Sequence, residues 1–132
     1  MKLFYAAAAA STAGMVLSIY LTLLPPPQFC EISSFLSCET VLSSPYAYFL
    51  GLPTAAYGVV WFAVASSGVL LAADRKAVAK FMTIWSFFGV AAVAVLVYVE
   101  FFLIGSLCIL CTVAHVLVFT VIAFYFYAKR RT

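Results

Sequence analysis

Residues Gly105–Cys111, with the sequence GSLCILC, span the junction between two long apolar runs and hold two of the chain's four cysteines. The first two residues of this stretch predict a short turn between the runs at residues 81–104 and 107–128. The second run then starts a helix with Cys108 and Cys111 on its first turn. Two residues three apart share one face of a helix, and a helix N-terminus stabilises a thiolate. The stretch therefore predicts a redox-active pair of thiols.

The composition excludes a soluble globular domain. Of the 132 residues, 67% are hydrophobic and only 8% are charged, whereas soluble domains carry about 25% charged residues. A helix needs roughly 20 apolar residues to cross a bilayer, and four runs reach that length: residues 3–24, 50–73, 81–104 and 107–128. We predict an all-α integral membrane protein, a bundle of four transmembrane helices that forms one domain over residues 1–132.

The first run is predicted to be a membrane span rather than a signal peptide. It is longer than a typical signal core. It also ends in Pro25-Pro26-Pro27, where a signal peptide would carry a cleavage site between small residues. The prolines end the helix, because proline lacks the backbone donor that a helix interior needs.

All seven basic residues lie at the ends of the apolar runs: Lys2, Arg75, Lys76, Lys80 and residues 129–131. These positions belong to alternate connections, so they share one side of the membrane. The positive-inside rule makes that side cytoplasmic. Topology thus explains the net charge of +3 better than nucleic-acid binding does. We expect a multi-pass protein of the plasma membrane with both termini in the cytoplasm.

The connection at residues 25–49 contains Cys30 and Cys38 and has no lysine or arginine. Under this topology it faces outward, as does the turn before Cys108, so all four cysteines lie where disulfides persist. Apolar residues at helical spacing predict a short amphipathic helix in this loop that caps the bundle. On one unbroken helix Cys30 and Cys38 would be roughly 12 Å apart, too far for a disulfide. If these two cysteines pair, the helix must break between them.

Three uses of the cysteines remain open from spacing alone. A disulfide relay fits the CxxC, because a helix N-terminus lowers a thiol pKa and speeds exchange. Two structural disulfides would close small rings worth roughly 2–2.6 kcal/mol, which is little for a bundle held by packing in lipid. A zinc site fits poorly, because two membrane spans separate the cysteine pairs. We expect no bound metal.

Besides cysteines and tyrosines, two ionisable residues lie inside the predicted spans. Glu100 is one turn from the outer end of the third run, where it is a structural or neutral residue, part of a proton path, or a group that tunes the nearby CxxC. His115 is one turn after Cys111 on the same helix face. It is either a satisfied core histidine or a donor of a hydrogen bond or proton to a ligand.

Aromatic residues gather where the second run begins, and two compatible interpretations apply to them. They can form an interfacial aromatic belt, and they can also form the rim of a pocket for a planar ring. The residues are Tyr46, Tyr48, Phe49 and Tyr57.

Taken together, these motifs resemble the vitamin K epoxide reductase family, particularly its bacterial and archaeal homologues. The resemblance covers nearly the whole chain. Its motifs are Cys30-x7-Cys38, Ser43-Ser44, the sequence GLPTAAYG at residues 51–58, and Cys108-x2-Cys111. It implies a four-helix bundle around a quinone, which would be menaquinone, ubiquinone or a related vitamin K-like quinone. It also implies a thioredoxin-like or DsbA-like partner acting in trans.

The resemblance also implies roles for single residues. Cys30 would exchange with the partner, Cys38 would pass electrons to Cys108, and Cys111 would reduce the quinone. The candidate quinone contacts are Ser44, Thr54, Tyr57 and His115. Thr54 stands where the family often has asparagine, and His115 where the vertebrate enzymes have tyrosine, but both can still donate a hydrogen bond. Epoxide reduction is a vertebrate role and is not expected here.

Two rival functions differ from this expectation in recognisable ways. The DsbB family performs similar chemistry in a similar bundle, but its CxxC lies in the first outer loop and its distant pair in the second, the reverse of the order in this chain. A small four-helix transporter with structural disulfides would need a charged residue deep in a span, whereas Glu100 lies near an end.

Overall fold

The computed structural model describes residues 2–23, 48–49, 51–72 and 74–131. Four helical segments of this described part are long and apolar enough to cross a membrane. They are α1 (Lys2–Leu23), α3 (Thr54–Ala72), α4 (Lys76–Tyr98) with its π-helical continuation η3 (Val99–Ile104), and α5 (Ile109–Arg131). The predicted all-α membrane bundle is therefore confirmed. The predicted amphipathic cap, with Cys30, Cys38 and Ser44, lies outside the described residues.

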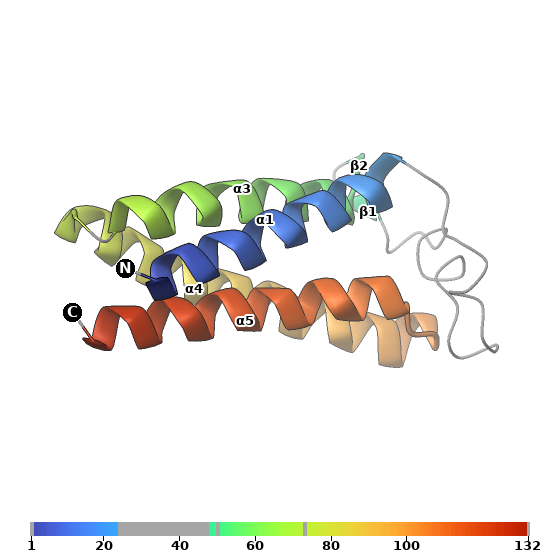
Figure 1. Ribbon diagram of the computed structural model, residues 1–132. Helices are drawn as coiled ribbons and strands as arrows, with labels where there is room; N and C mark the ends of the chain where they lie inside the picture. The colour runs from blue at the N-terminus through green and yellow to red at the C-terminus, as the bar shows by residue number, and fades with distance from the viewer. Residues whose placement is uncertain (1, 24–47, 50, 73, 132) are drawn as a thin grey trace.

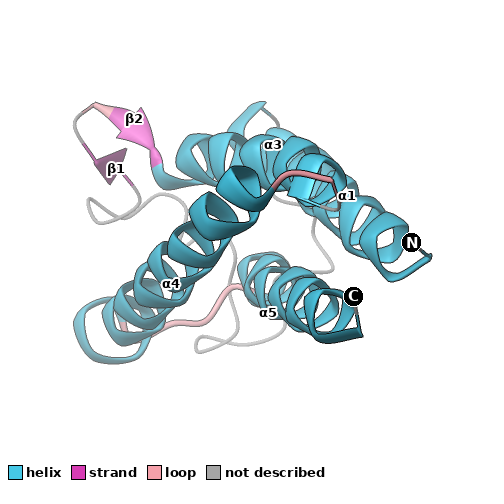
Figure 2. Ribbon diagram, turned by 90° about the vertical axis from the view of Figure 1, so that its left-hand side faces the viewer, coloured by secondary structure: helices cyan, strands magenta, loops and turns pink. Residues whose placement is uncertain are grey.

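The helices run alternately up and down, so their ends meet in two groups (Figure 1). The helix α1 packs against α3 and α5, and α3 packs against α4. Figure 2 views the bundle end-on and shows α3 between α1 and α4. We call the end at Leu23, Thr54, Ile104 and Cys108 the cysteine end. The opposite end, which carries both chain termini, is the basic end.

Each of the four helices buries one face, on which most residues recur three or four positions apart. This spacing follows the helical repeat of about 3.6 residues and turns one face of each helix toward its neighbours. Many of the buried residues are small, which lets membrane helices approach closely. The buried faces include Ala7, Ser11, Gly14, Ser18 and Leu21 in α1; Trp61, Phe62, Ala65, Gly68 and Val69 in α3; Met82, Ser86, Gly89 and Val93 in α4; Val118, Val121, Tyr125 and Ala128 in α5.

The contact between α1 and α3 shows why small residues are needed. The Ser11 hydroxyl donates a hydrogen bond of 2.7 Å to the carbonyl of Phe62. The Phe62 ring lies directly over Gly14, where an added Cβ would overlap it. The buried serine thus satisfies its polar group across the interface, and the glycine makes room for the ring.

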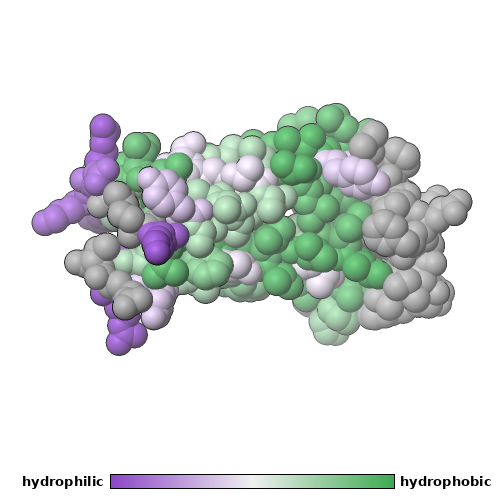
Figure 3. Space-filling view, in the orientation of Figure 1, coloured by the Kyte–Doolittle hydropathy of each residue, from purple (hydrophilic) through white to green (hydrophobic). Residues whose placement is uncertain are grey.

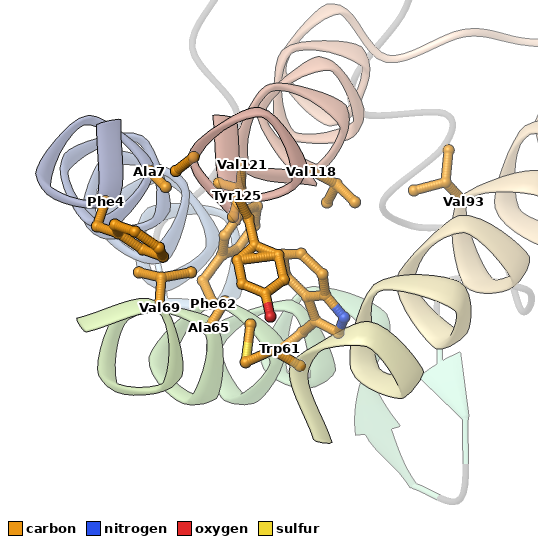
Figure 4. Close-up of a cluster of buried hydrophobic side chains, with 12 residues drawn as sticks. Phe4, Ala7, Trp61, Phe62, Ala65, Val69, Val93, Val118, Val121 and Tyr125 are labelled. Atoms are coloured by element: carbon orange, nitrogen blue, oxygen red, sulfur yellow. The ribbon is translucent and has the colours of Figure 1, made fainter. Parts of the chain in front are cut away.

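Two tryptophans join α3 to α4 through a reciprocal pair of hydrogen bonds. The Trp61 indole donates to the carbonyl of Trp85 and the Trp85 indole donates to the carbonyl of Trp61, both at 3.2 Å. Their rings stack with centroids 6.5 Å apart. The Tyr125 hydroxyl of α5 donates to the carbonyl of Ala79 at 2.9 Å. Figure 4 shows Trp61 and Tyr125 within the core, where each polar tip needs a partner in this apolar setting.

The outer surface is apolar in the middle and charged at one end. On α4 the side chains of Ile84, Phe87 and Phe88 are each more than 60% exposed, which a water-soluble monomer avoids. Figure 3 shows hydrophobic atoms over the body of the bundle on the visible face and hydrophilic ones at the basic end. The exposed basic residues there are Lys2, Arg75, Lys76, Lys80, Lys129 and Arg130. The apolar surface contacts the lipid bilayer. The basic residues lie together at one end of the bundle, as their positions in the sequence predicted.

The helix ends differ from the apolar runs by a few residues. The helix α3 begins at Thr54 rather than at residue 50, because β1 (Tyr48–Phe49) and β2 (Leu52–Pro53) pair as an antiparallel hairpin. Gly51 has a φ of 82°, the left-handed conformation that such a tight turn requires. At the basic end, α4 begins at Lys76 and α5 reaches Arg131, because a helix can continue past its apolar run where its side chains reach water.

Candidate redox site

Cys108 occupies the N-cap position of α5, one residue before the helix begins. Its carbonyl accepts the first helical hydrogen bond, from the Thr112 amide at 2.9 Å. Its sulfur accepts a hydrogen bond from the Cys111 amide at 3.4 Å, the bond that an N-cap side chain makes to the third helical residue. The sequence placed both cysteines on the first helical turn. The structure puts Cys108 at the cap and Cys111 on that turn.

The side chains of the two cysteines also interact directly. The Cys111 thiol hydrogen-bonds the Cys108 sulfur, and this bond lowers the pKa of Cys108 below its usual range. Burial of Cys108 raises its pKa, but this effect is smaller than that of the hydrogen bond. No S–S bond joins the two sulfurs in this structure. Of the two, Cys108 is therefore the better thiolate and the better leaving group in exchange.

The two cysteine residues differ in exposure. Cys108 is fully buried and packs against Ile104, Ile109, Leu110 and Cys111. Cys111 is only half-buried. Of the two cysteines, Cys111 is thus the residue with the more exposed surface in this conformation.

Glu100 lies against the CxxC as the buried residue of η3. A π-helix adds a residue to one turn and occurs often at functional sites. The π-type bond from the Gly105 amide to the Glu100 carbonyl measures 2.9 Å. Gly105 then reverses the chain with a φ of 77°. This turn brings the Glu100 carboxylate to the Cys108 amide, from which it accepts a hydrogen bond.

The Glu100 carboxylate is only half satisfied. The residue is 4% exposed, and its Oε2 atom has no hydrogen-bond partner among the described residues. Sequence reasoning left the role of Glu100 open, with tuning of the nearby CxxC as one possibility, and the structure sets its carboxylate against the Cys108 amide. The available signal was its type, because a carboxylate within a membrane span marks a functional site by default.

The other predicted site residues that the structure describes lie on helices that meet at the cysteine end. Thr54 begins α3 and is half-buried, while Tyr57 lies one turn later and is exposed. His115 is half-buried on α5, one turn after Cys111. Both helices start at the cysteine end (Figure 1).

A groove of about 510 Å³ lies at the basic end, away from the cysteines. It is lined by Lys76, Ala79, Lys80, Thr83, Ile84 and Lys129. The groove includes none of the predicted quinone contacts, so the candidate site rests on the CxxC and the residues around it.

Comparison with known proteins places the chain in a family. No curated protein matches it significantly. The model of the vitamin K epoxide reductase family matches residues 5–126, a range that contains the CxxC, Glu100 and His115 and parts of all four transmembrane segments. The chain therefore belongs to the vitamin K epoxide reductase family, whose members are membrane oxidoreductases that act on thiols and quinones.

Proposed function

We propose that the protein oxidises a thioredoxin-like or DsbA-like partner outside the cytoplasm and reduces a quinone in the membrane. Electrons enter at Cys30 and Cys38, pass to Cys108 and Cys111, and leave to the quinone. The observation that carries this proposal is the hydrogen-bonded CxxC at a helix N-terminus, at the end of the bundle opposite the basic residues.

The helix cap supports Cys108 as the entry point of electrons. In the proposed transfer, the Cys38 thiolate attacks Cys108 in the Cys108–Cys111 disulfide, forms a mixed disulfide and releases Cys111. Cys30 then attacks Cys38 and expels Cys108 as a thiolate. A low-pKa thiol leaves fastest, and Cys108 is the sulfur with the lowered pKa.

The burial of the two cysteine residues supports the same order. A protein in solution cannot reach Cys108 in this conformation, because its side chain is fully buried. A cysteine of the same chain is tethered and can be delivered to it, which is the role proposed for Cys38. The half-buried Cys111 remains on the side open to a ligand.

The residues at the cysteine end fit a quinone. The surroundings of the CxxC are apolar through Ile104, Ile109 and Leu110, and Thr54 and His115 supply hydrogen-bond donors from the two helices that start there. Ser44 and Tyr57 complete the proposed contacts. When bound, the quinone supplies an acceptor for two electrons and two protons. Menaquinone, ubiquinone and a vitamin K-like quinone share this chemistry.

The direct test is quinone reduction by the purified protein supplied with a reduced thioredoxin-like protein. Cys111→Ala is expected to abolish quinone reduction, because it removes the sulfur proposed to face the ring. The same variant keeps the Cys30–Cys38 disulfide and should oxidise its partner once. Counting the thiols oxidised per protein separates a single turnover from catalysis, and sustained turnover would remove Cys111 from this role.

A second variant tests the path between the pairs. Cys38→Ala is expected to stop transfer from the protein donor, while small chemical reductants still feed Cys108 and Cys111. Quinone reduction is measured with both donors. Equal rates of the variant with the two donors would argue against a shuttle through Cys38.

A further inference from the structure

Glu100 is a buried acid that the proposed electron path does not use. Its carboxylate accepts a hydrogen bond from the Cys108 amide, and its Oε2 has no partner within the described part of the chain. A buried carboxylate with an unsatisfied oxygen is unfavourable unless it binds a proton or a cation. The position of Glu100 beside the CxxC therefore needs a chemical reason.

The charges around Glu100 decide which form it takes. The other charged residues of the described segments lie at the basic end, so none of them neutralises Glu100. In the described segments the titratable groups at the cysteine end are the two cysteines and His115, with Tyr20 on α1, Tyr48 on β1, Tyr57 on α3 and Tyr98 on α4. None of these residue types is ordinarily a cation at neutral pH.

A carboxylate and a thiolate side by side would place two negative charges in a poorly solvated site. Like charges in such a setting disfavour each other strongly, and two neighbouring acids then share one proton. The helix N-terminus and the Cys111 thiol both stabilise the thiolate of Cys108. While Cys108 holds the charge, Glu100 is the group that keeps the proton.

We propose that Glu100 stores a proton for the Cys108–Cys111 pair, as a neutral acid when the pair is reduced and as a carboxylate when the pair is a disulfide. This inference rests on the proposed function in one respect, because it requires the pair to cycle between dithiol and disulfide. It adds a proton carrier to that cycle and keeps the net charge of the buried site at −1 in both states.

Oxidation of the Cys108–Cys111 pair with loss of the Glu100 proton conserves atoms and charge. The reduced site holds the Cys108 thiolate, the Cys111 thiol and the Glu100 acid. Oxidation forms the S–S bond, breaks the S–H bond of Cys111 and the O–H bond of Glu100, and releases two electrons and two protons. The oxidised site holds a disulfide and a carboxylate. The electrons and protons pass to the quinone acceptor of the proposed function, and reduction by Cys38 and Cys30 reverses the changes.

The test measures how the reduction potential of the pair depends on pH, in thiol redox buffers without quinone or partner. A Cys30→Ser/Cys38→Ser protein isolates the CxxC. Its potential is expected to follow two protons per two electrons near neutral pH. Glu100→Gln keeps the oxygen that accepts the Cys108 amide but carries no titratable proton, so the slope should fall to about half, one proton per two electrons.

A matched control is Ser106→Ala, which changes another buried polar side chain near Cys108 without removing a titratable proton. Its slope should equal that of the parent. An unchanged slope in Glu100→Gln would overturn the proposal. Because the assay contains no quinone, its outcome is independent of whether the protein reduces one.

A second measurement needs no substitution at Glu100 and so avoids any folding defect. Infrared difference spectra of the Cys30→Ser/Cys38→Ser protein, made with isotopically labelled glutamate, report protonated carboxyl groups. A glutamic-acid C=O band should be present with the pair reduced and should vanish on oxidation. The absence of a redox-linked glutamate band would overturn the proposal. So would a slope of one proton per two electrons in the Cys30→Ser/Cys38→Ser protein at a pH where Cys108 absorbs as a thiolate.

Discussion

Cys108 caps α5 with the same sulfur that the proposed chemistry uses. Two donors, the Cys111 amide and the Cys111 thiol, converge on it. A hydrogen bond to a charged group is worth roughly 1.5–3 kcal/mol, and one pKa unit corresponds to about 1.4 kcal/mol. The reactivity of Cys108 therefore depends on its neighbour three residues later.

Cys111→Ala should raise the pKa of Cys108, since it removes the thiol donor and leaves the amide donor. In a reduced Cys30→Ser/Cys38→Ser background, the midpoint of the pH dependence of Cys108 alkylation should move upward accordingly. Thr112→Val is the control, because the Thr112 hydroxyl bonds the Cys108 carbonyl at 2.8 Å and not the sulfur. A midpoint that Cys111→Ala leaves in place would show that the thiol does not stabilise the thiolate.

His115→Phe should slow quinone reduction about 10- to 100-fold. A hydrogen bond from His115 to a ring oxygen strengthens as negative charge develops there, and such bonds are worth roughly 1.5–3 kcal/mol. Steady-state rates across quinone concentrations measure the effect, and partner oxidation by the loop disulfide should change little. His115→Tyr restores a donor and should recover part of the loss. A native rate in His115→Phe would identify a core histidine.

At the scale of the helices, glycines decide how closely neighbours approach. An alanine Cβ at Gly89 would lie 2.6 Å from the Trp61 ring, and one at Gly14 would overlap the Phe62 ring. Both rings are buried, and Trp61 is also held by its hydrogen bonds to Trp85. At Gly68 the new Cβ would meet only the flexible side chain of Met82.

Gly14→Ala and Gly89→Ala should each destabilise the bundle by about 1–3 kcal/mol, the usual range for overpacking. Gly68→Ala should be close to neutral, since Met82 can adapt and alanine favours the helix by up to about 1 kcal/mol over glycine. Unfolding of the purified protein in detergent measures the three free energies side by side. Equal destabilisation by all three variants would mean that ring rigidity does not limit the packing.

The π-helix acts at the same scale and turns one residue of the third span inward. In η3 only Glu100 is buried, while Phe101, Phe102 and Leu103 are exposed. These phenylalanines therefore face lipid rather than a pocket. The wider π turn and the reversal at Gly105 together set Glu100 beside the amide of Cys108, eight residues later in the chain.

For the whole molecule, the segregation of basic residues predicts the orientation in the membrane. A membrane-impermeant thiol reagent should label reduced Cys30 in intact cells but not a cysteine introduced by Ala77→Cys, a position exposed at the basic end. The positive-inside rule is the physical reason, because lysines and arginines are retained in the cytoplasm. Labelling after membrane permeabilisation controls for reactivity at position 77. The opposite pattern would put the redox pairs in a reducing compartment.

The fold class follows from local properties of the chain. Apolar runs long enough to span a bilayer, interrupted by polar or proline-rich connections, leave few choices besides a four-helix membrane bundle. The family motifs, with Cys108 and Cys111 at their centre, are likewise readable from spacing. The hairpin before Thr54 was harder to foresee, because its residues are as apolar as the helix that follows and only Gly51 marks the turn.

The sequence by itself determined four spans, the shared end of the basic residues and a thiol pair at the start of the last helix. Only the tertiary structure decided that Cys108 caps the helix, that Trp61 and Trp85 bond each other, and that Glu100 reaches Cys108. Hydropathy and spacing belong to each segment alone. Contacts between segments depend on how each helix is rotated about its axis, and the packing of all the helices together sets that rotation.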